Sequence, residues 1–123
     1  MVAGRGSSYN TRVTNPGTNA VWRLGLVQDQ RDGLLVVTVD GRIGSAEAPR
    51  LTAFLTDAIA AGNRRILLDL KGVDYISSAG VIALEAAAAR LWTDQGELTL
   101  SGVTPPVRLA LELAGFPPDV PLL

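Results

Sequence analysis

Short apolar runs separated by polar turns give the first half of the chain a strand-like pattern. Residues 21–27 alternate imperfectly between apolar and polar side chains, as an edge strand does. Residues 34–39 are continuously apolar and rich in β-branched side chains, as in a strand covered on both faces. The polar stretch 29–33 between these runs predicts a turn, and Asp40 with Gly41 ends the second run. The pattern therefore predicts a β-hairpin at Asp32-Gly33, which would put an antiparallel edge on the sheet.

Helical spacing begins soon after this hairpin. Ser45 is the expected N-cap, Glu47 falls in the positive first turn, and Pro49 is early enough to be tolerated. The apolar positions that follow recur at helical spacing: Leu51, Phe54, Leu55, Ala58 and Ile59. The pair 62–63 ends this helix, and residues 66–70 then read as a short buried strand.

The second half repeats the alternation. An alanine-rich helix is predicted over residues 79–93, followed by a strand at 98–100. The positions expected on or near the buried side of that helix are Val81, Ile82, Leu84, Ala88 and Leu91. A third helix is predicted with Thr104 as its cap, Pro105 at its first position and Gly115 as its C-cap.

The predicted order is β-β-α-β-α-β-α with short connections. Such alternation indicates an α/β fold with a mixed sheet of four to five strands and helices packed on it. Residues 1–19 are rich in Gly, Ser, Thr and Asn and predict a flexible N-terminal arm. The alternative is that part of this arm docks as an extra strand or helix. The single folded domain is expected over residues 20–123.

Composition excludes several classes of function. The 123 residues contain no histidine and no cysteine, which removes the commonest general base, the commonest metal ligand and every thiolate site. We therefore expect neither an enzyme nor a metal or cofactor site. The net charge of −1 gives no sign of nucleic-acid binding. Without a signal peptide or a long apolar run, the expected location is the cytoplasm, with no membrane insertion.

Two adjacent serines, Ser77 and Ser78, lie where the strand at 66–70 leads into the alanine-rich helix. In α/β folds, ligands and functional loops gather beyond the carboxyl ends of strands. One interpretation is a helix cap, because a serine hydroxyl accepts a hydrogen bond from an orphan backbone N–H. The other is phosphorylation, since a phosphoserine near −2 in charge is tolerated at a helix N-terminus. The residues alone leave both open.

Several short stretches occur in the order found in a known family. They are residues 39–43, 48–51, 66–70, 72–76, 77–81 and 107–116. Together they resemble a STAS domain of the anti-sigma factor antagonist family, over about residues 24–116. Ser77 stands where the switch motif of the family often begins with Asp, and Gly44 stands where many members carry Asp.

The resemblance implies a partner-switching role in the regulation of transcription. Family members bind an anti-sigma factor that is also a serine kinase. The kinase then phosphorylates the switch serine, and the complex dissociates. A phosphatase removes the phosphate and restores the binding form. Aligned on the following glycine, that serine corresponds to Ser78, with Ser77 as the alternative and as the expected cap. The implied partner-binding residues are Arg42, Gly44, Ser45, Asp74, Tyr75, Ser77, Ser78, Ala79 and Val81. The competing hypothesis is a STAS scaffold subunit of a transporter or signalling assembly that is not phosphorylated.

Overall fold

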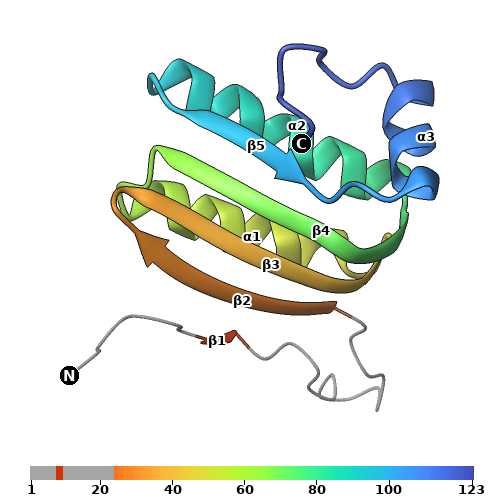
Figure 1. Cartoon of the computed structure of the whole chain (residues 1–123), viewed down its shortest axis with the longest axis horizontal. Helices are drawn as coiled ribbons and strands as arrows, with labels where there is room; N and C mark the ends of the chain where they lie inside the picture. The colour runs from red at the N-terminus through yellow and green to blue at the C-terminus, as the bar shows by residue number, and fades with distance from the viewer. Residues whose placement is uncertain (1–7, 10–23) are drawn as a thin grey trace.

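The computed structural model describes residues 8–9 and 24–123. The elements are β1 Ser8–Tyr9, β2 Leu24–Arg31, β3 Leu34–Ile43, α1 Ala48–Ala60, β4 Arg65–Ile76, α2 Ser78–Thr93, β5 Glu97–Ser101 and α3 Pro105–Leu113 (Figure 1). From β2 onward this is the predicted order. The rest of the predicted arm and the start of the first predicted strand lie outside the described residues. Within the arm, β1 forms a short extra strand, as the alternative prediction allowed.

The five strands form one sheet in the order β1-β2-β3-β4-β5. The pairs β1–β2 and β2–β3 are antiparallel, whereas β3–β4 and β4–β5 are parallel, so the predicted mixed sheet is confirmed. A two-residue turn joins β2 to β3, and both of its residues have positive φ, 52° at Asp32 and 84° at Gly33. Turns of this kind match the twist of paired strands. The hairpin predicted at Asp32-Gly33 is confirmed, whereas the predicted turn at 29–33 was too long, because residues 29–31 belong to β2.

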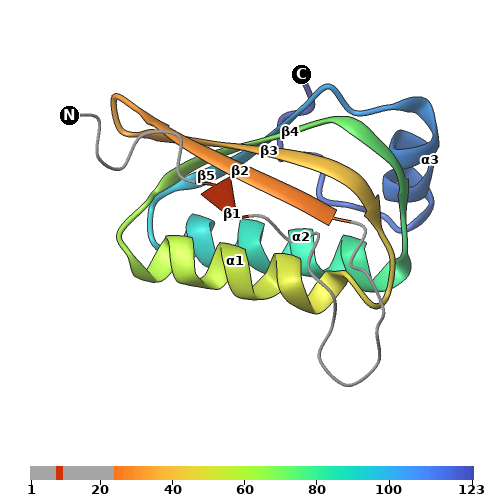
Figure 2. The ribbon, with the colours of Figure 1, turned by 90° about the horizontal axis from the view of Figure 1, so that it is seen from below.

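Helices α1 and α2 lie side by side against one face of the sheet, and the hydrophobic core fills the space between (Figure 2). The predicted apolar face of α1 is confirmed, since each of its five positions is buried. Burial of a large aliphatic side chain contributes about 1.5–3 kcal/mol. The largest fully buried side chains are Leu24, Leu26, Leu35, Ile43, Leu51, Leu55, Ile66, Leu68, Leu70, Leu84, Leu91 and Leu100.

The two central strands are longer than predicted. β3 continues past Asp40 and Gly41 to Ile43, and β4 runs for 12 residues to Ile76 instead of ending at residue 70. Register shifts between β3 and β4 accommodate the irregular residues, and Gly41 adopts a φ of 117°. These extensions carry both strands toward the start of α2.

The C-terminal part closes one edge of the sheet. After α3, the Gly115 N–H donates to the Glu112 carbonyl at 3.1 Å and the Phe116 N–H to the Leu111 carbonyl at 3.0 Å, a Schellman ending with Gly115 at φ 72°. The final residues then run along β5, where the Leu123 N–H donates to the Leu100 carbonyl at 2.7 Å. This segment covers the outer edge of β5.

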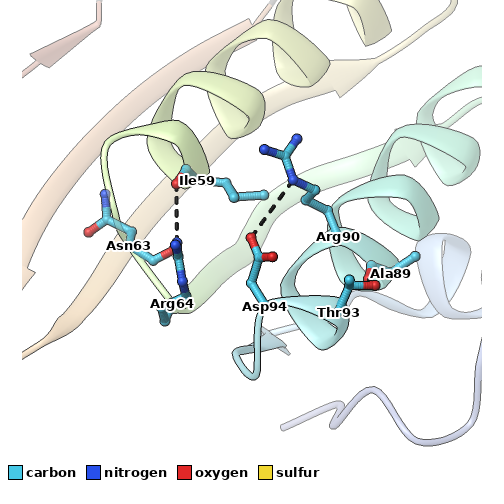
Figure 3. A network of polar contacts seen from close by, with 7 residues as sticks. All are labelled: Ile59, Asn63, Arg64, Ala89, Arg90, Thr93 and Asp94. Atoms are coloured by element: carbon cyan, nitrogen blue, oxygen red, sulfur yellow. Dashed lines mark hydrogen bonds and ion pairs between the residues drawn. The ribbon is translucent and has the colours of Figure 1, made fainter.

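Polar contacts lie at the C-terminal ends of α1 and α2 (Figure 3). The Arg64 guanidinium donates to the Ile59 carbonyl at 3.2 Å, and the Thr93 hydroxyl donates to the Ala89 carbonyl at 3.0 Å. Arg90 lies 3.8 Å from Asp94. In residues 8–9 and 24–123, no helix is long and apolar enough to cross a bilayer.

Candidate functional site at the start of the second helix

Ser77 connects the end of β4 to α2 and caps the helix. Its backbone N–H donates to the Ile43 carbonyl at 2.8 Å, which ties the connection to the end of β3. Its ψ of 171° is extended, and its side-chain oxygen accepts the Gly80 N–H at 3.2 Å. This is the geometry of an N-cap serine. The predicted capping role of Ser77 is confirmed.

Ser78 is the first residue of α2 and is exposed. The first N–H groups of a helix have no acceptor within the helix, and the positive end of the helix dipole lies there. Because Ser77 makes the cap, the Ser78 hydroxyl is not needed for it. The connection therefore presents one structural serine and one exposed serine beside a positive helix end.

Gly80 fixes how closely this helix start approaches the sheet. A Cβ added at Gly80 would lie 2.7 Å from Cγ2 of Ile43 and 2.7 Å from Cγ1 of Ile76. Real Cβ atoms essentially never come so close, so a larger residue would force the helix away from both strand ends. Gly80 thus sets the position of Ser78 relative to β3 and β4.

The neighbouring connection from β3 to α1 differs from the prediction. The N-cap of α1 is Glu47, and no side chain caps this helix, so the assignment of Ser45 as N-cap was wrong. Glu47 is buried, with 8% exposure, and its Oε1 accepts the Gly44 N–H at 3.0 Å. A Cβ at Gly44 would lie 2.7 Å from that oxygen. The Glu47 carboxylate therefore occupies the space that a side chain at position 44 would need, and Ser45 is left exposed.

Exposed side chains from β3 and β4 form the rim beside this connection. The Arg42 guanidinium carbon lies 4.3 Å from the centroid of the Tyr75 ring, within cation–π range. Asp74 is also exposed. The register pairs Gly41 with Val73 and Ile43 with Ile76, which brings these side chains to the end of the sheet where α2 begins.

A shallow hollow of about 410 Å³ lies between the starts of α1 and α2. Its lining residues are Ser45, Ala48, Pro49, Thr52, Ala53, Ala79 and Ile82.

Ile82 is 62% exposed, so its predicted place on the buried side of α2 was wrong. Val81, expected to contact a partner, is 3% exposed and belongs to the core, so its side chain does not reach the surface. The chain turns by 100° per helical residue, and adjacent positions therefore face apart.

The described structure thus brings most of the predicted site residues together at one end of the sheet. Arg42, Ser45, Asp74, Tyr75 and Ser78 are exposed there, whereas Gly44 is buried. Sequence reasoning missed the part of the hollow contributed by Pro49, Thr52, Ala53 and Ile82. Small and polar side chains on the exposed face of the first helix were the available signal.

Comparison with known proteins decides the family. The STAS domain model matches residues 26–122. The chain belongs to the STAS domain family. This STAS domain is 42% identical over 91 residues to BtrV of Bordetella bronchiseptica, by its name a candidate anti-sigma factor antagonist, and the match covers 74% of this chain and 78% of BtrV.

Solved structures share the fold. The Bacillus cell fate determinant SpoIIAA in its phosphorylated form superimposes with a TM-score of 0.64 at 17% identity, covering 80% of this chain and 90% of that one. A sulfate transporter family protein from Wolinella succinogenes gives a TM-score of 0.61 at 27% identity, covering 70% of each chain. The predicted STAS-like fold is confirmed.

Proposed function

We propose that this STAS domain is an anti-sigma factor antagonist that acts in the cytoplasm and is controlled by phosphorylation of Ser78. In the proposed cycle, the unphosphorylated protein binds an anti-sigma factor with serine kinase activity and frees a sigma factor. Phosphate transfer to Ser78 then dissociates the complex, and a phosphatase returns the protein to its unphosphorylated form. The observation that carries the proposal is the division between Ser77, which caps α2, and Ser78, which is exposed at its first position.

The surroundings of Ser78 support a binding surface that a phosphate would disable. The adjacent hollow is lined mainly by apolar groups, and Ile82 stands exposed at its edge. An apolar side chain of a partner would lose contact with water on entering it. A phosphate of charge near −2 beside that contact would have to be desolvated, which opposes binding.

The helix start would accept this phosphate without unfolding. Free N–H groups and the helix dipole favour an anion at this position. Phosphorylation would therefore change the surface while leaving the fold intact. SpoIIAA, a relative in fold, has been solved in both phosphorylated and unphosphorylated forms.

A kinase would recognise this chain differently from a family member that carries the two aspartates of the family pattern. Ser77 and Gly44 stand in place of those aspartates, and the buried Glu47 carboxylate is turned inward to the Gly44 N–H. In the proposal, the kinase binds the surface formed by Ser78, the hollow and the rim that carries Arg42 and Tyr75.

Incubation with the candidate kinase and ATP, followed by mass spectrometry, tests the phosphorylation step. We expect one phosphate on Ser78, none on Ser78→Ala, and normal transfer to Ser77→Thr, which keeps a capping hydroxyl. Phosphate on another residue in the wild type, unaffected by Ser78→Ala, contradicts the assignment.

The release step needs a separate pair of variants. Ser78→Glu adds a charge, and Ser78→Gln adds similar bulk without it. We expect Ser78→Glu to weaken kinase binding by about tenfold or more in titration calorimetry, and Ser78→Gln to weaken it less. Equal affinities for the two variants would exclude charge as the cause of release.

A second candidate function is a scaffold role in a transport assembly. The Wolinella succinogenes sulfate transporter family protein, at 27% identity, is the observation that favours it. The 42% identity to BtrV over most of the chain favours the first candidate more strongly. Affinity purification of the full chain separates them, since recovery of a permease without a kinase would support the scaffold.

A further inference from the structure

A second surface lies at the end of α2 opposite Ser78. Trp92 is near the C-terminal end of this helix and is 73% exposed. It borders a groove of about 230 Å³ that is lined by α2, the start of β5 and the C-terminal segment. Fourteen residues at 1.5 Å each place Trp92 about 21 Å along the helix from Ser78. The groove is therefore separate from the proposed switch site.

The floor of the groove is apolar. Ala88 and Ala89 of α2, Leu98 of β5 and Val120 with Pro121 of the C-terminal segment contribute to it. The small alanine side chains leave room beside the large indole ring. The C-terminal segment is held along β5 by backbone hydrogen bonds, among them Leu100 N–H to the Pro121 carbonyl at 2.9 Å. One wall of the groove is thus fixed to the sheet.

Charge on the groove has one sign. The charged residues in its lining are Glu85, Glu97 and Asp119, all acidic. The nearby cation on the same helix, Arg90, is turned to the other side, where it lines the space between α1 and α2 and lies 3.8 Å from Asp94 (Figure 3). Arg64 likewise donates to carbonyls at the end of α1. Arg65 of β4 is the register partner of Glu97, so the acidic groups of the lining that face a partner are Glu85 and Asp119.

We propose that this groove binds a basic, amphipathic segment of a partner protein, in which an arginine or lysine is flanked by apolar side chains. The apolar residues would pack on the floor, and the cation would lie against the Trp92 ring between Glu85 and Asp119. An indole face is the strongest aromatic acceptor for a cation. Acidic groups around an apolar contact also select against acidic partners. The inference does not depend on the proposed function, because it uses no residue of the switch site.

The probe is a short capped peptide in which leucine and arginine alternate, and the control peptide carries glutamate in place of arginine. Binding to the full ¹⁵N-labelled chain is followed by backbone and indole chemical shifts. We expect shifts concentrated on the groove residues with the basic peptide only. Equal binding of the acidic peptide, or shifts spread evenly over the sheet, would overturn the proposal.

Variants then assign the binding to the groove. We expect Trp92→Ala to weaken peptide binding by about tenfold, and the double variant Glu85→Gln with Asp119→Asn by about fivefold. The control is Leu113→Ala, another exposed apolar residue, on α3, which should change nothing. Thermal unfolding checks that each variant is folded. Unchanged affinity in folded Trp92→Ala contradicts the proposal, as does a concentration-dependent dimer whose contacts occupy the groove.

Discussion

The hydrogen bond from the Gly44 N–H places the Glu47 carboxylate where a side chain at position 44 would lie. The Glu47 oxygen lies 3.0 Å from the backbone nitrogen of Gly44, and a Cβ at that residue would be 2.7 Å from the same oxygen. A carboxylate added at position 44 would meet both a steric and an electrostatic barrier. The Glu47 carboxylate therefore fills the space beside position 44, which accommodates glycine in this chain.

Gly44→Asp should accordingly destabilise the fold by about 1–3 kcal/mol, because the Glu47 carboxylate would have to leave the Gly44 N–H and the two carboxylates would repel each other. Urea unfolding followed by circular dichroism measures the change. Glu47→Ala is the matched partner variant. Since removing Glu47 relieves the clash, the double variant should be less destabilised than the sum of the two single changes. Simple additivity of the two effects would contradict this account.

Local signals predicted the Ser77 cap correctly, because a cap depends on neighbours within three residues. The role of Glu47 is just as local in sequence but was missed. The pattern predicts that a glutamate near a helix start interacts with the helix dipole, whereas the side chain of Glu47 folds back onto the preceding loop. Sequence alone does not distinguish these two orientations.

Element lengths depend on contacts that the sequence does not display. Asp40 and Gly41 looked like a break, yet β3 continues because Asp40 pairs with Gly72 and Gly41 with Val73 on β4. The same pairing extends β4 beyond its predicted end. Alanines on several sides of α2 blur its apolar stripe, so Ile82 was placed on the wrong face. The order and type of the elements could be predicted from the sequence. The ends of β3 and β4 could not, because they depend on how the two strands pair. The buried face of α2 could not, because it depends on how the helix packs.

Gly80→Ala tests how the start of α2 is seated. Alanine is the better helix former by about 1 kcal/mol, yet the added methyl group would meet Ile43 and Ile76 at 2.7 Å. We expect the clash to prevail and the variant to lose about 1–3 kcal/mol of stability, measured by urea unfolding. The control is Ala86→Gly at an exposed position of the same helix, where alanine should be the more stable residue. Stabilisation by Gly80→Ala would show that the helix start has room to shift.

At the scale of the molecule, α2 links two different surfaces. Its first turn carries the exposed Ser78 beside an apolar hollow, and its last turns carry Trp92 beside an acidic groove. Packing against the sheet and α1 holds the helix between them. Partners at the two ends would contact separate parts of the chain, so a phosphate at Ser78 would act on one of them directly.

The face of the sheet away from α1 and α2 carries a charge pair that makes stability depend on pH. Leu68 and Leu70 point into the core, so Asp69 between them faces the opposite way. Burial raises the pKa of the Asp69 carboxyl. The hydrogen bonds from the Lys71 ammonium at 2.9 Å and the Lys71 backbone N–H at 3.1 Å, together with the charge of Lys71, lower this pKa by more than burial raises it. The net pKa of Asp69 is therefore below the usual value.

Because the folded pKa is the lower one, the unfolded chain binds the proton more readily in acid. The stabilisation from ionised Asp69 is therefore complete above the ordinary aspartate pKa of about 3.9 and is lost as the pH falls through the lower folded value. We expect Asp69→Asn to lower the free energy of unfolding at pH 6, with the difference from wild type shrinking below about pH 4. Urea unfolding between about pH 2 and pH 7 measures it. In the Lys71→Met background, the effect of Asp69→Asn on the free energy of unfolding should be smaller, because the ammonium that lowers the pKa of Asp69 is gone. An effect of Asp69→Asn that does not change with pH would rule out ionisation of Asp69 as its cause.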